Sequence, residues 1–310
     1  MQVTESILRL RLAQPELCRT LLERRQRRVH WEAEKLVLLA IDHPARRVVA
    51  AGKNPWAMAD RGELLTRVAR VLMQPFVNGL LATPDIIEEV LLLNHLVVEA
   101  GGPNFIDGKI LVGSMNRGGL ANTVFELDDV VTGYTPESIA ALHLDAGKLL
   151  FRLDPDSRDS LRTMQYCVDA LNVLEDHNLP CFLEPLTTNG STDDLVRLVG
   201  VASAMGYSSA HRWLKLPMVG DMARVAAATT CPIVLLGGGN PGTTEQLVAN
   251  VTEALAAGPN VRGLMIGRGV LYPEDDVDPV VVASKLAAAV YEEEQEVVLW
   301  DGLKSTHLVG

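Results

Sequence analysis

The sequence predicts a (β/α)8 TIM barrel that carries an N-terminal helical extension. Short β-type runs alternate with amphipathic helical stretches from residue 36 onward, and the β-type runs number eight. This alternation is typical of parallel strands that are joined by helical crossovers. We expect strands at 36–42, 79–83, 109–115, 147–154, 180–186, 212–218, 231–238 and 262–268. The expected organisation is an extension at 1–35, a single barrel domain at 36–295 and a C-terminal tail at 296–310.

The segments between the expected strands carry the start and stop signals of helices. Ser191 stands before a run that opens with two aspartates and ends at Gly206, and Thr243 or Thr244 begins a run that ends at Gly258. Hydroxyl residues cap helix N-termini, acidic residues suit the first turn, and glycine suits the C-terminal cap. One segment, 116–135, has an irregular pattern, and we expect a long functional loop there.

A doubly wound open sheet is the alternative architecture. It calls for a G-x-G-x-x-G turn directly after the first strand, and the sequence LAIDHPARRVVAAGKNP contains none. The glycine-rich run GGGNPG follows the seventh expected strand instead, where barrels commonly place a phosphate site. The barrel is therefore favoured.

Composition limits the functional classes. Hydrophobic residues make up 48% of the 310 residues and no apolar run approaches the roughly 18 residues of a membrane span, so we expect no membrane partner. The N-terminus mixes Glu and Arg into its apolar positions, unlike a secretory signal, and we expect a cytoplasmic protein. A net charge of −11 argues against a nucleic-acid surface. Apolar residues in the extension and the tail favour a homo-oligomer.

Three groups of residues are predicted to have no catalytic or ligand-binding role. The basic run ERRQRRVH at 23–30 is interpreted as a solvated helix face rather than a site for an anion or a second subunit. The four cysteines lack C-x-x-C spacing and are expected to be buried, reduced thiols. The histidines form no H-x-H or H-E-x-x-H pair, so we expect neither a metal site nor a cofactor.

Polar residues gather at the carboxyl ends of the expected strands, where barrels carry their active sites. Lys215 lies in the apolar run RWLKLPM of the sixth strand. A barrel has no edge strand at which a lysine could reach solvent, so a catalytic role is favoured over a structural one. Asp42 ends the first strand, Lys148 lies in the fourth and Glu184 in the fifth. These three either form structural salt bridges or move protons.

A buried lysine with a lowered pKa suits attack on a carbonyl to give a Schiff base. The protonated imine is an electron sink that stabilises the carbanion left when a neighbouring carbon–carbon bond breaks. The expected phosphate contacts are backbone groups of a glycine-rich turn and side chains of arginines. They are Gly238, Gly239, Gly267, Arg268 and Arg152. A plain tight turn at the glycines is the alternative.

The motifs AID, GKLLFRLD, CFLEPL, WLKLP, VLLGGG and GLMIGRG together resemble the class I aldolases of the deoxyribose-phosphate aldolase and tagatose-bisphosphate aldolase group. The resemblance covers about 36–270. It implies Lys215 as the Schiff-base lysine, with Lys148, Glu184 and Asp42 at the matching catalytic positions. It also implies phosphate binding by the backbone after strand seven and by the Gly-Arg pair after strand eight.

The sequence also resembles an actinobacterial branch of this group that is linked to myo-inositol breakdown. This resemblance implies cleavage of 2-deoxy-5-keto-gluconate 6-phosphate to dihydroxyacetone phosphate and malonate semialdehyde. We therefore expect a metal-independent aldolase that acts on a phosphorylated keto sugar or keto sugar acid. Two rivals stay open: a sugar-phosphate isomerase or epimerase without a covalent intermediate, and a non-catalytic barrel that binds a phosphorylated metabolite.

Overall fold

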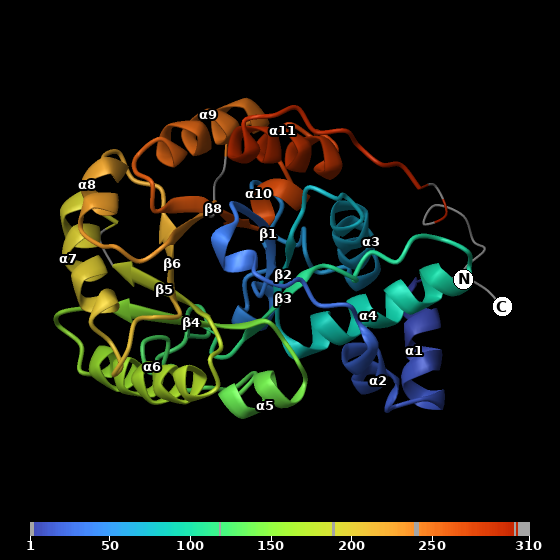
Figure 1. Ribbon diagram of the computed structural model, residues 1–310, viewed down its shortest axis with the longest axis horizontal. Coiled ribbons are helices and arrows are strands. Elements are labelled where there is room, and N and C mark those ends of the chain that lie inside the picture. The colour runs from blue at the N-terminus through green and yellow to red at the C-terminus, as the bar shows by residue number, and fades with distance from the viewer. Residues whose placement is uncertain (1–2, 118, 188–189, 239–241, 301, 303–310) are drawn as a thin grey trace.

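The computed structural model describes residues 3–300 and 302, except 118, 188–189 and 239–241. Eight parallel strands pair in chain order, and the eighth also pairs with the first, so the sheet closes into a barrel (Figure 1). The strands are β1 (Leu36–Ile41), β2 (Gly79–Ala82), β3 (Ile110–Ser114), β4 (Ala146–Leu153), β5 (Cys181–Thr187), β6 (Arg212–Pro217), β7 (Ile233–Leu236) and β8 (Val261–Ile266). The predicted (β/α)8 TIM barrel is confirmed, and the open sheet is excluded.

Helices surround the barrel and fill the crossovers (Figure 1). The helices are α1 (Val3–Ala13), α2 (Leu17–Arg24), α3 (Arg61–Leu72), α4 (Pro84–Glu99), α5 (Pro136–Ala141), α6 (Asp159–Asp176), α7 (Thr192–Ser203), α8 (Met222–Ala227), α9 (Thr244–Leu255), α10 (Arg268–Leu271) and α11 (Pro279–Tyr291), with short 3-10 turns η1 (Trp31–Ala33) and η2 (Pro44–Arg46). Ser191 caps α7 and Thr243 caps α9 as predicted. In the part of the chain that is described, no helix is long and apolar enough to cross a membrane.

Alternation along the strands separates two apolar regions. In β1, Leu36, Leu38 and Ala40 belong to the cluster inside the barrel, whereas Val37 and Leu39 pack in the layer between the strands and the helices. This period of two follows from the pleat, which points successive side chains to opposite faces. The barrel interior is therefore a packed core rather than a channel.

An aromatic cluster closes the N-terminal end of the barrel. Trp31 comes from η1, just before β1, and is 3% exposed. Its ring lies 5.9 Å from that of Phe182 in β5 and 5.9 Å from that of Trp213 in β6. The last part of the 1–35 segment thus supplies part of the barrel core.

The basic run at 23–30 does not form only a solvated face, and that interpretation is wrong for Arg25. Its side chain is buried, and it donates to Asp145 Oδ2 at 2.7 Å and to the carbonyl of Lys109 at 3.1 Å. Asp145 and Lys109 immediately precede β4 and β3. Arg27 contacts the other oxygen of Asp145 at 2.8 Å. The run therefore fastens the N-terminal segment to the strand starts, a tertiary pairing that charge patterning along the sequence does not reveal.

The cysteines are free thiols, as expected. Cys167, Cys181 and Cys231 are buried, and Cys18 is half-buried. Burial raises the pKa of the Cys167 and Cys181 thiols, so both stay protonated at neutral pH. These residues act as small apolar side chains in the core.

Candidate active site

A layer of charged side chains lies directly above the apolar layer inside the barrel. Each charged residue stands two positions after an interior apolar residue of the same segment, so strand alternation turns it inward. The four pairs are Ala40 and Asp42, Ala146 and Lys148, Phe182 and Glu184, and Trp213 and Lys215. The two-residue spacing therefore directs each charged side chain to the interior of the closed barrel.

These four charged side chains contact one another. Lys148 Nζ lies 2.8 Å from Asp42 Oδ2 and 2.8 Å from Glu184 Oε2, and Lys215 Nζ lies 2.9 Å from the same Glu184 oxygen. All four residues are buried, with exposures from 0% for Lys148 to 4% for Glu184. Two cations and two carboxylates thus balance inside the barrel, which is the condition under which buried charge is tolerated.

The two lysines differ electrostatically. Burial lowers the pKa of Lys215, and the nearby charge of Lys148 lowers it further, against the opposing effect of Glu184. Burial also disfavours the charged form of Lys148, but the carboxylates of Asp42 and Glu184 outweigh it and raise the pKa of Lys148. Environments that push two pKa values apart assign different roles to chemically identical groups. Lys215 is the lysine that can become a neutral amine.

Both carboxylates stay ionised. Burial alone would raise their pKa values, but the ammonium groups of Lys148 and Lys215 lower the pKa of Glu184 to about 2 and that of Asp42 well below its usual range. Asp42 Oδ1 is buried and has no hydrogen-bond partner among the described residues, and the nearby His43 Nδ1 lies 3.7 Å away. Burial lowers the pKa of His43 to about 3, so this ring is neutral. Asp42 Oδ1 is therefore available to accept a hydrogen bond from a bound hydroxyl.

The segments after β7 and β8 meet at one side of the charged layer. Gly238 has φ +67°, which favours glycine, and a Cβ on Gly267 would lie 1.8 Å from the carbonyl oxygen of Ala40. Among the described residues, the guanidinium of Arg268 makes only long contacts, 3.5 Å to the carbonyl of Ala50 and 3.4 Å to that of Gly238. Gly239, the remaining predicted glycine of this group, lies outside the described residues.

Arg152 lies at the end of β4 and forms an ion pair with Glu126. Its predicted phosphate contact stays a prediction, and this pair would have to open or rearrange to meet it. Glu126 belongs to the expected irregular loop, which forms no helix in its described residues between Ser114 and Thr135. Asn116 holds the start of this loop to β4 by donating to the carbonyl of Leu150 at 2.6 Å.

Two residues near the site escaped the sequence prediction. Ser114 is buried, lies beside Lys148 in the β3–β4 register and donates to the carbonyl of Asn116 at 3.1 Å. Arg46 ends η2, is 9% exposed and forms no ion pair with any described carboxylate. The motif DHPARR, directly after the first strand, was the available signal for Arg46.

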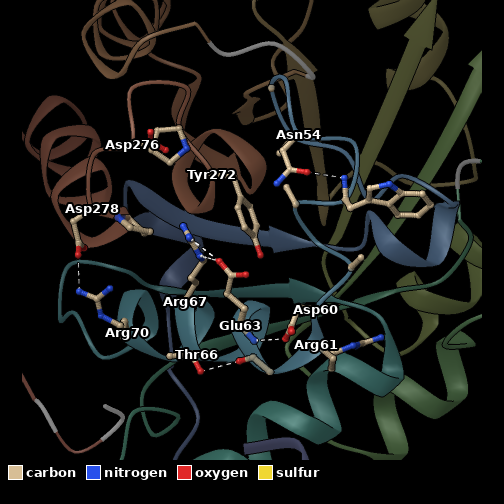
Figure 2. A pocket seen from close by; sticks show the side chains of 18 of the residues that line it. Asn54, Asp60, Arg61, Glu63, Thr66, Arg67, Arg70, Tyr272, Asp276 and Asp278 are labelled. Carbon is tan, nitrogen blue, oxygen red and sulfur yellow. Dashed lines mark hydrogen bonds and ion pairs between the residues drawn. The ribbon is translucent and has the colours of Figure 1, made fainter. Parts of the chain in front are cut away.

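A wide groove of about 1260 Å³ lies outside this charged layer, between the segment after β1, α3 and the segment after α10 (Figure 2). None of the four buried charged residues lines it. Some of its charges pair locally, as in Arg67 with Glu63 and Arg70 with Asp278. Within the described ranges, no group of three or more His, Cys, Asp and Glu side chains is arranged to hold a metal ion.

Comparison with known proteins places the chain in a family. The Cgl0159-like family matches residues 34–288. The crystal structure of Cgl0159 from Corynebacterium glutamicum is 37% identical, with 94% of this chain and 97% of that chain covered and a TM-score of 0.84. No curated protein matches the sequence.

More distant structures share the fold. A Schiff-base-forming fructose-1,6-bisphosphate aldolase is 18% identical over 88% of this chain and 100% of that chain, with a TM-score of 0.59. An archaeal fructose 1,6-bisphosphate aldolase is 18% identical over 89% of this chain and 99% of that chain, with the same TM-score of 0.59. The fold is therefore that of these class I aldolases, and the chain belongs to the Cgl0159-like family.

Proposed function

We propose that this protein is a metal-independent class I aldolase that cleaves a phosphorylated keto sugar or keto sugar acid through a Schiff base on Lys215. The observation that carries the proposal is the position of Lys215, which is buried in the barrel 2.9 Å from Glu184 with a lowered pKa. A lowered pKa makes loss of the proton easier, and the neutral amine is a nucleophile for carbonyl carbon. The shared fold with class I aldolases supports the same chemistry.

In the first half of the reaction, neutral Lys215 Nζ adds to the substrate ketone to give a carbinolamine. The hydroxyl of this intermediate takes up a proton from solvent and leaves as water, and a protonated imine remains. Glu184 contacts Nζ directly, so it can accept a proton from the attacking amine and pass it to the oxygen that becomes the departing hydroxyl. Lys148 stays charged and holds the carboxylates of Glu184 and Asp42 in place.

In the second half, the carbon–carbon bond next to the imine carbon breaks and its electron pair moves into the imine, giving an enamine. The proton of the β-hydroxyl leaves at the same time, and an aldehyde forms. Asp42 orients this hydroxyl or relays its proton, because its Oδ1 atom lacks a partner among the described residues. The enamine then takes a proton at carbon, and water hydrolyses the imine to release the ketone product and free Lys215.

The substrate class follows from the resemblance and from the cationic residues around the site. We propose 2-deoxy-5-keto-gluconate 6-phosphate as the first candidate, with dihydroxyacetone phosphate and malonate semialdehyde as products. Gly238, Gly267 and Arg268 would hold the phosphate, and Gly239, which follows Gly238 in the sequence, is the fourth predicted contact. The cleavage assay should also include a phosphorylated keto sugar that lacks a carboxylate, because the proposed substrate class includes such sugars.

Reductive trapping tests the proposal. The protein is incubated with dihydroxyacetone phosphate, reduced with borohydride, digested and analysed by mass spectrometry. We expect a stable adduct on Lys215 that is absent from Lys215→Ala, whereas Lys285, exposed on α11, stays unmodified and reports nonspecific trapping. Cleavage of 2-deoxy-5-keto-gluconate 6-phosphate should continue in the presence of EDTA. Absence of an adduct while dihydroxyacetone phosphate binds would contradict the proposal.

Product analysis separates the proposal from an isomerase or epimerase on the same barrel. Only an aldolase changes the carbon count of its product. Enolisation by a carboxylate base would proceed without a covalent intermediate, so borohydride would leave no adduct on Lys215. Binding without turnover across a panel of keto sugar phosphates would instead favour a non-catalytic barrel.

A further inference from the structure

Two arginines, Arg46 and Arg268, follow neighbouring strands at the carboxyl end of the barrel. Arg46 ends the η2 turn that follows β1, and Arg268 follows β8 directly. Strands β1 and β8 pair through Leu39 and Ile266, so the segments that carry the two arginines leave the barrel at neighbouring points. Arg268 itself reaches the β1 segment, because it contacts the carbonyl of Ala50.

Arg46 is buried and, among the described residues, lacks the side-chain partners that other buried arginines have. Its side chain is nine-tenths buried, and its Nε atom has no hydrogen-bond partner among the described residues. By contrast, buried Arg25 contacts Asp145, and buried Arg212 donates to the carbonyls of Ala202 and Met205. A largely buried guanidinium that forms no ion pair with a described carboxylate is costly to keep charged, so an anion from outside the chain would stabilise it.

Arg268 is partly buried and is also incompletely paired among the described residues. Its Nε atom is buried without a partner in the described structure, and its two hydrogen bonds are long. Burial lowers the pKa of Arg268, and the charge of Arg46 lowers it further. The carboxylates of Asp42 and Glu184 oppose this effect, but both are already engaged with Lys148. The two guanidinium groups therefore repel each other with no described carboxylate bridging them.

The backbone of Arg46 is fixed in place from two sides. Its N–H donates to the carbonyl of His43 at 2.9 Å, and its own carbonyl accepts from the N–H of Ala121 at 3.0 Å. Ala121 belongs to the long loop between β3 and α5. The backbone from which the Arg46 side chain projects is thus held in place before any ligand binds, which reduces part of the ordering cost of binding.

We propose that Arg46 and Arg268 form a clamp that holds one phosphate dianion of the substrate between the ends of β1 and β8. Arg46 is thereby assigned as a phosphate-binding residue opposite Arg268. A phosphate dianion matches the two positive charges, and each guanidinium can meet it through two parallel hydrogen bonds. A single carboxylate would leave one of the two charges uncompensated. The identity of this phosphate as part of the aldol substrate rests on the proposed function.

Calorimetric titration with inorganic phosphate tests the clamp. We expect the Kd of Arg46→Gln and of Arg268→Gln to rise by about 10- to 100-fold, the range expected for loss of charge-assisted hydrogen bonds. Arg46→Lys should recover part of the affinity. Arg197→Gln, which removes the same charge from an exposed pair with Asp194, should bind as the wild type does. Circular dichroism and urea unfolding establish that each variant is folded.

Trapping with unphosphorylated dihydroxyacetone separates this inference from the proposed function. A normal adduct on Lys215 in Arg46→Gln, together with weakened phosphate binding, supports both. Weakened phosphate binding with no adduct in any protein, the wild type included, supports the clamp and contradicts the aldolase. A Kd for phosphate in Arg46→Gln within about twofold of the wild-type value overturns the clamp. No detectable binding of millimolar phosphate to the wild type overturns it as well.

Discussion

Lys148 and Lys215 contact the same carboxylate oxygen, Glu184 Oε2, at 2.8 and 2.9 Å. Lys148 also contacts Asp42, whereas the only carboxylate in contact with Lys215 in the described structure is that of Glu184. The lysine with two carboxylates keeps its proton and the lysine with one can lose it, in line with the raised pKa of Lys148 and the lowered pKa of Lys215. One shared oxygen thus couples the lysine proposed as nucleophile to the lysine proposed as its electrostatic partner.

Replacement of Lys148 by methionine should move the pH dependence of imine formation at Lys215 to higher pH. The charge of Lys148 lowers the pKa of Lys215, so its removal favours the charged form of Lys215 and raises that pKa. The measurement is the rate of reductive trapping with dihydroxyacetone phosphate across pH 6 to 10. Lys285→Met, a change on the exposed face of α11, should leave the profile where it is. A profile for Lys148→Met that stays in place or moves to lower pH would contradict the coupling.

Replacement of Glu184 by glutamine should reduce kcat by about 10²- to 10⁴-fold, the usual contribution of a positioned acid or base. The amide keeps the shape of the side chain but neither accepts the amine proton nor balances the two lysines. Steady-state assays of substrate cleavage measure kcat for the variant and the wild type. Glu88→Gln, on α4 beside Arg11, removes a carboxylate from a half-exposed pair and serves as the control. Equal kcat in the two variants would remove Glu184 from the mechanism.

Much of this architecture could be predicted from the sequence because barrel strands are continuous apolar runs with polar ends. The predicted strands overlap all eight observed ones, and the predicted first strand, 36–42, differs from Leu36–Ile41 by a single residue. The seventh strand is shorter than predicted, Ile233–Leu236 instead of 231–238. Lys215, Lys148, Glu184 and Asp42 could be grouped because the carboxyl ends of parallel strands meet at one end of a barrel.

The residues that sequence analysis missed depend on contacts between distant segments. Arg25 looked like part of a solvated charge run, yet Asp145, 120 positions later, pairs with it in the interior. Arg46 lies in the motif DHPARR, and its backbone carbonyl accepts a hydrogen bond from the N–H of Ala121 in a distant loop. Neither the partner of a charge nor the burial of a loop is encoded in local periodicity.

The ionised state of Glu184 predicts a loss of stability in acid. The pKa of this carboxyl falls from 4.5 to about 2, because Lys148 and Lys215 outweigh the opposing effect of burial. The unfolded chain takes up this proton near pH 4.5, so the contribution is complete above that pH and is lost as pH falls towards 2. A shift of this size corresponds to roughly 3 kcal/mol. Urea unfolding at a series of pH values should show the loss.

The Glu184→Gln variant is the control for this titration, because it lacks the carboxyl that titrates. Its urea midpoint should fall less steeply between pH 5 and 3 than that of the wild type, although it starts from a lower value at pH 7. Glu88→Gln should follow the wild-type curve. Parallel curves for Glu184→Gln and the wild type would mean that other carboxyl groups account for the acid sensitivity.

Replacement of Trp31 by alanine should destabilise the fold by about 3–5 kcal/mol, the usual cost of deleting a buried aromatic side chain. Trp31 comes from outside the strands, and its ring packs against Phe182 and Trp213 at the N-terminal end of the barrel. These two residues stand two positions before Glu184 and Lys215 in the same strands, so the cavity would open directly beneath the charged layer. Urea unfolding measures the loss, and Trp56→Ala, at a position that is 70% exposed, should change stability little.

The same variant separates a supporting role of the N-terminal segment from a catalytic one. If Trp31 acts only as packing, folded Trp31→Ala protein at low temperature should still form the Lys215 adduct, and its pH profile should keep the wild-type midpoint. A displaced profile would mean that the aromatic layer also fixes the distance between Lys215 and Glu184, since a larger separation weakens the Coulomb interaction that opposes loss of the Lys215 proton. In that case the midpoint should move to lower pH, opposite to the shift expected for Lys148→Met.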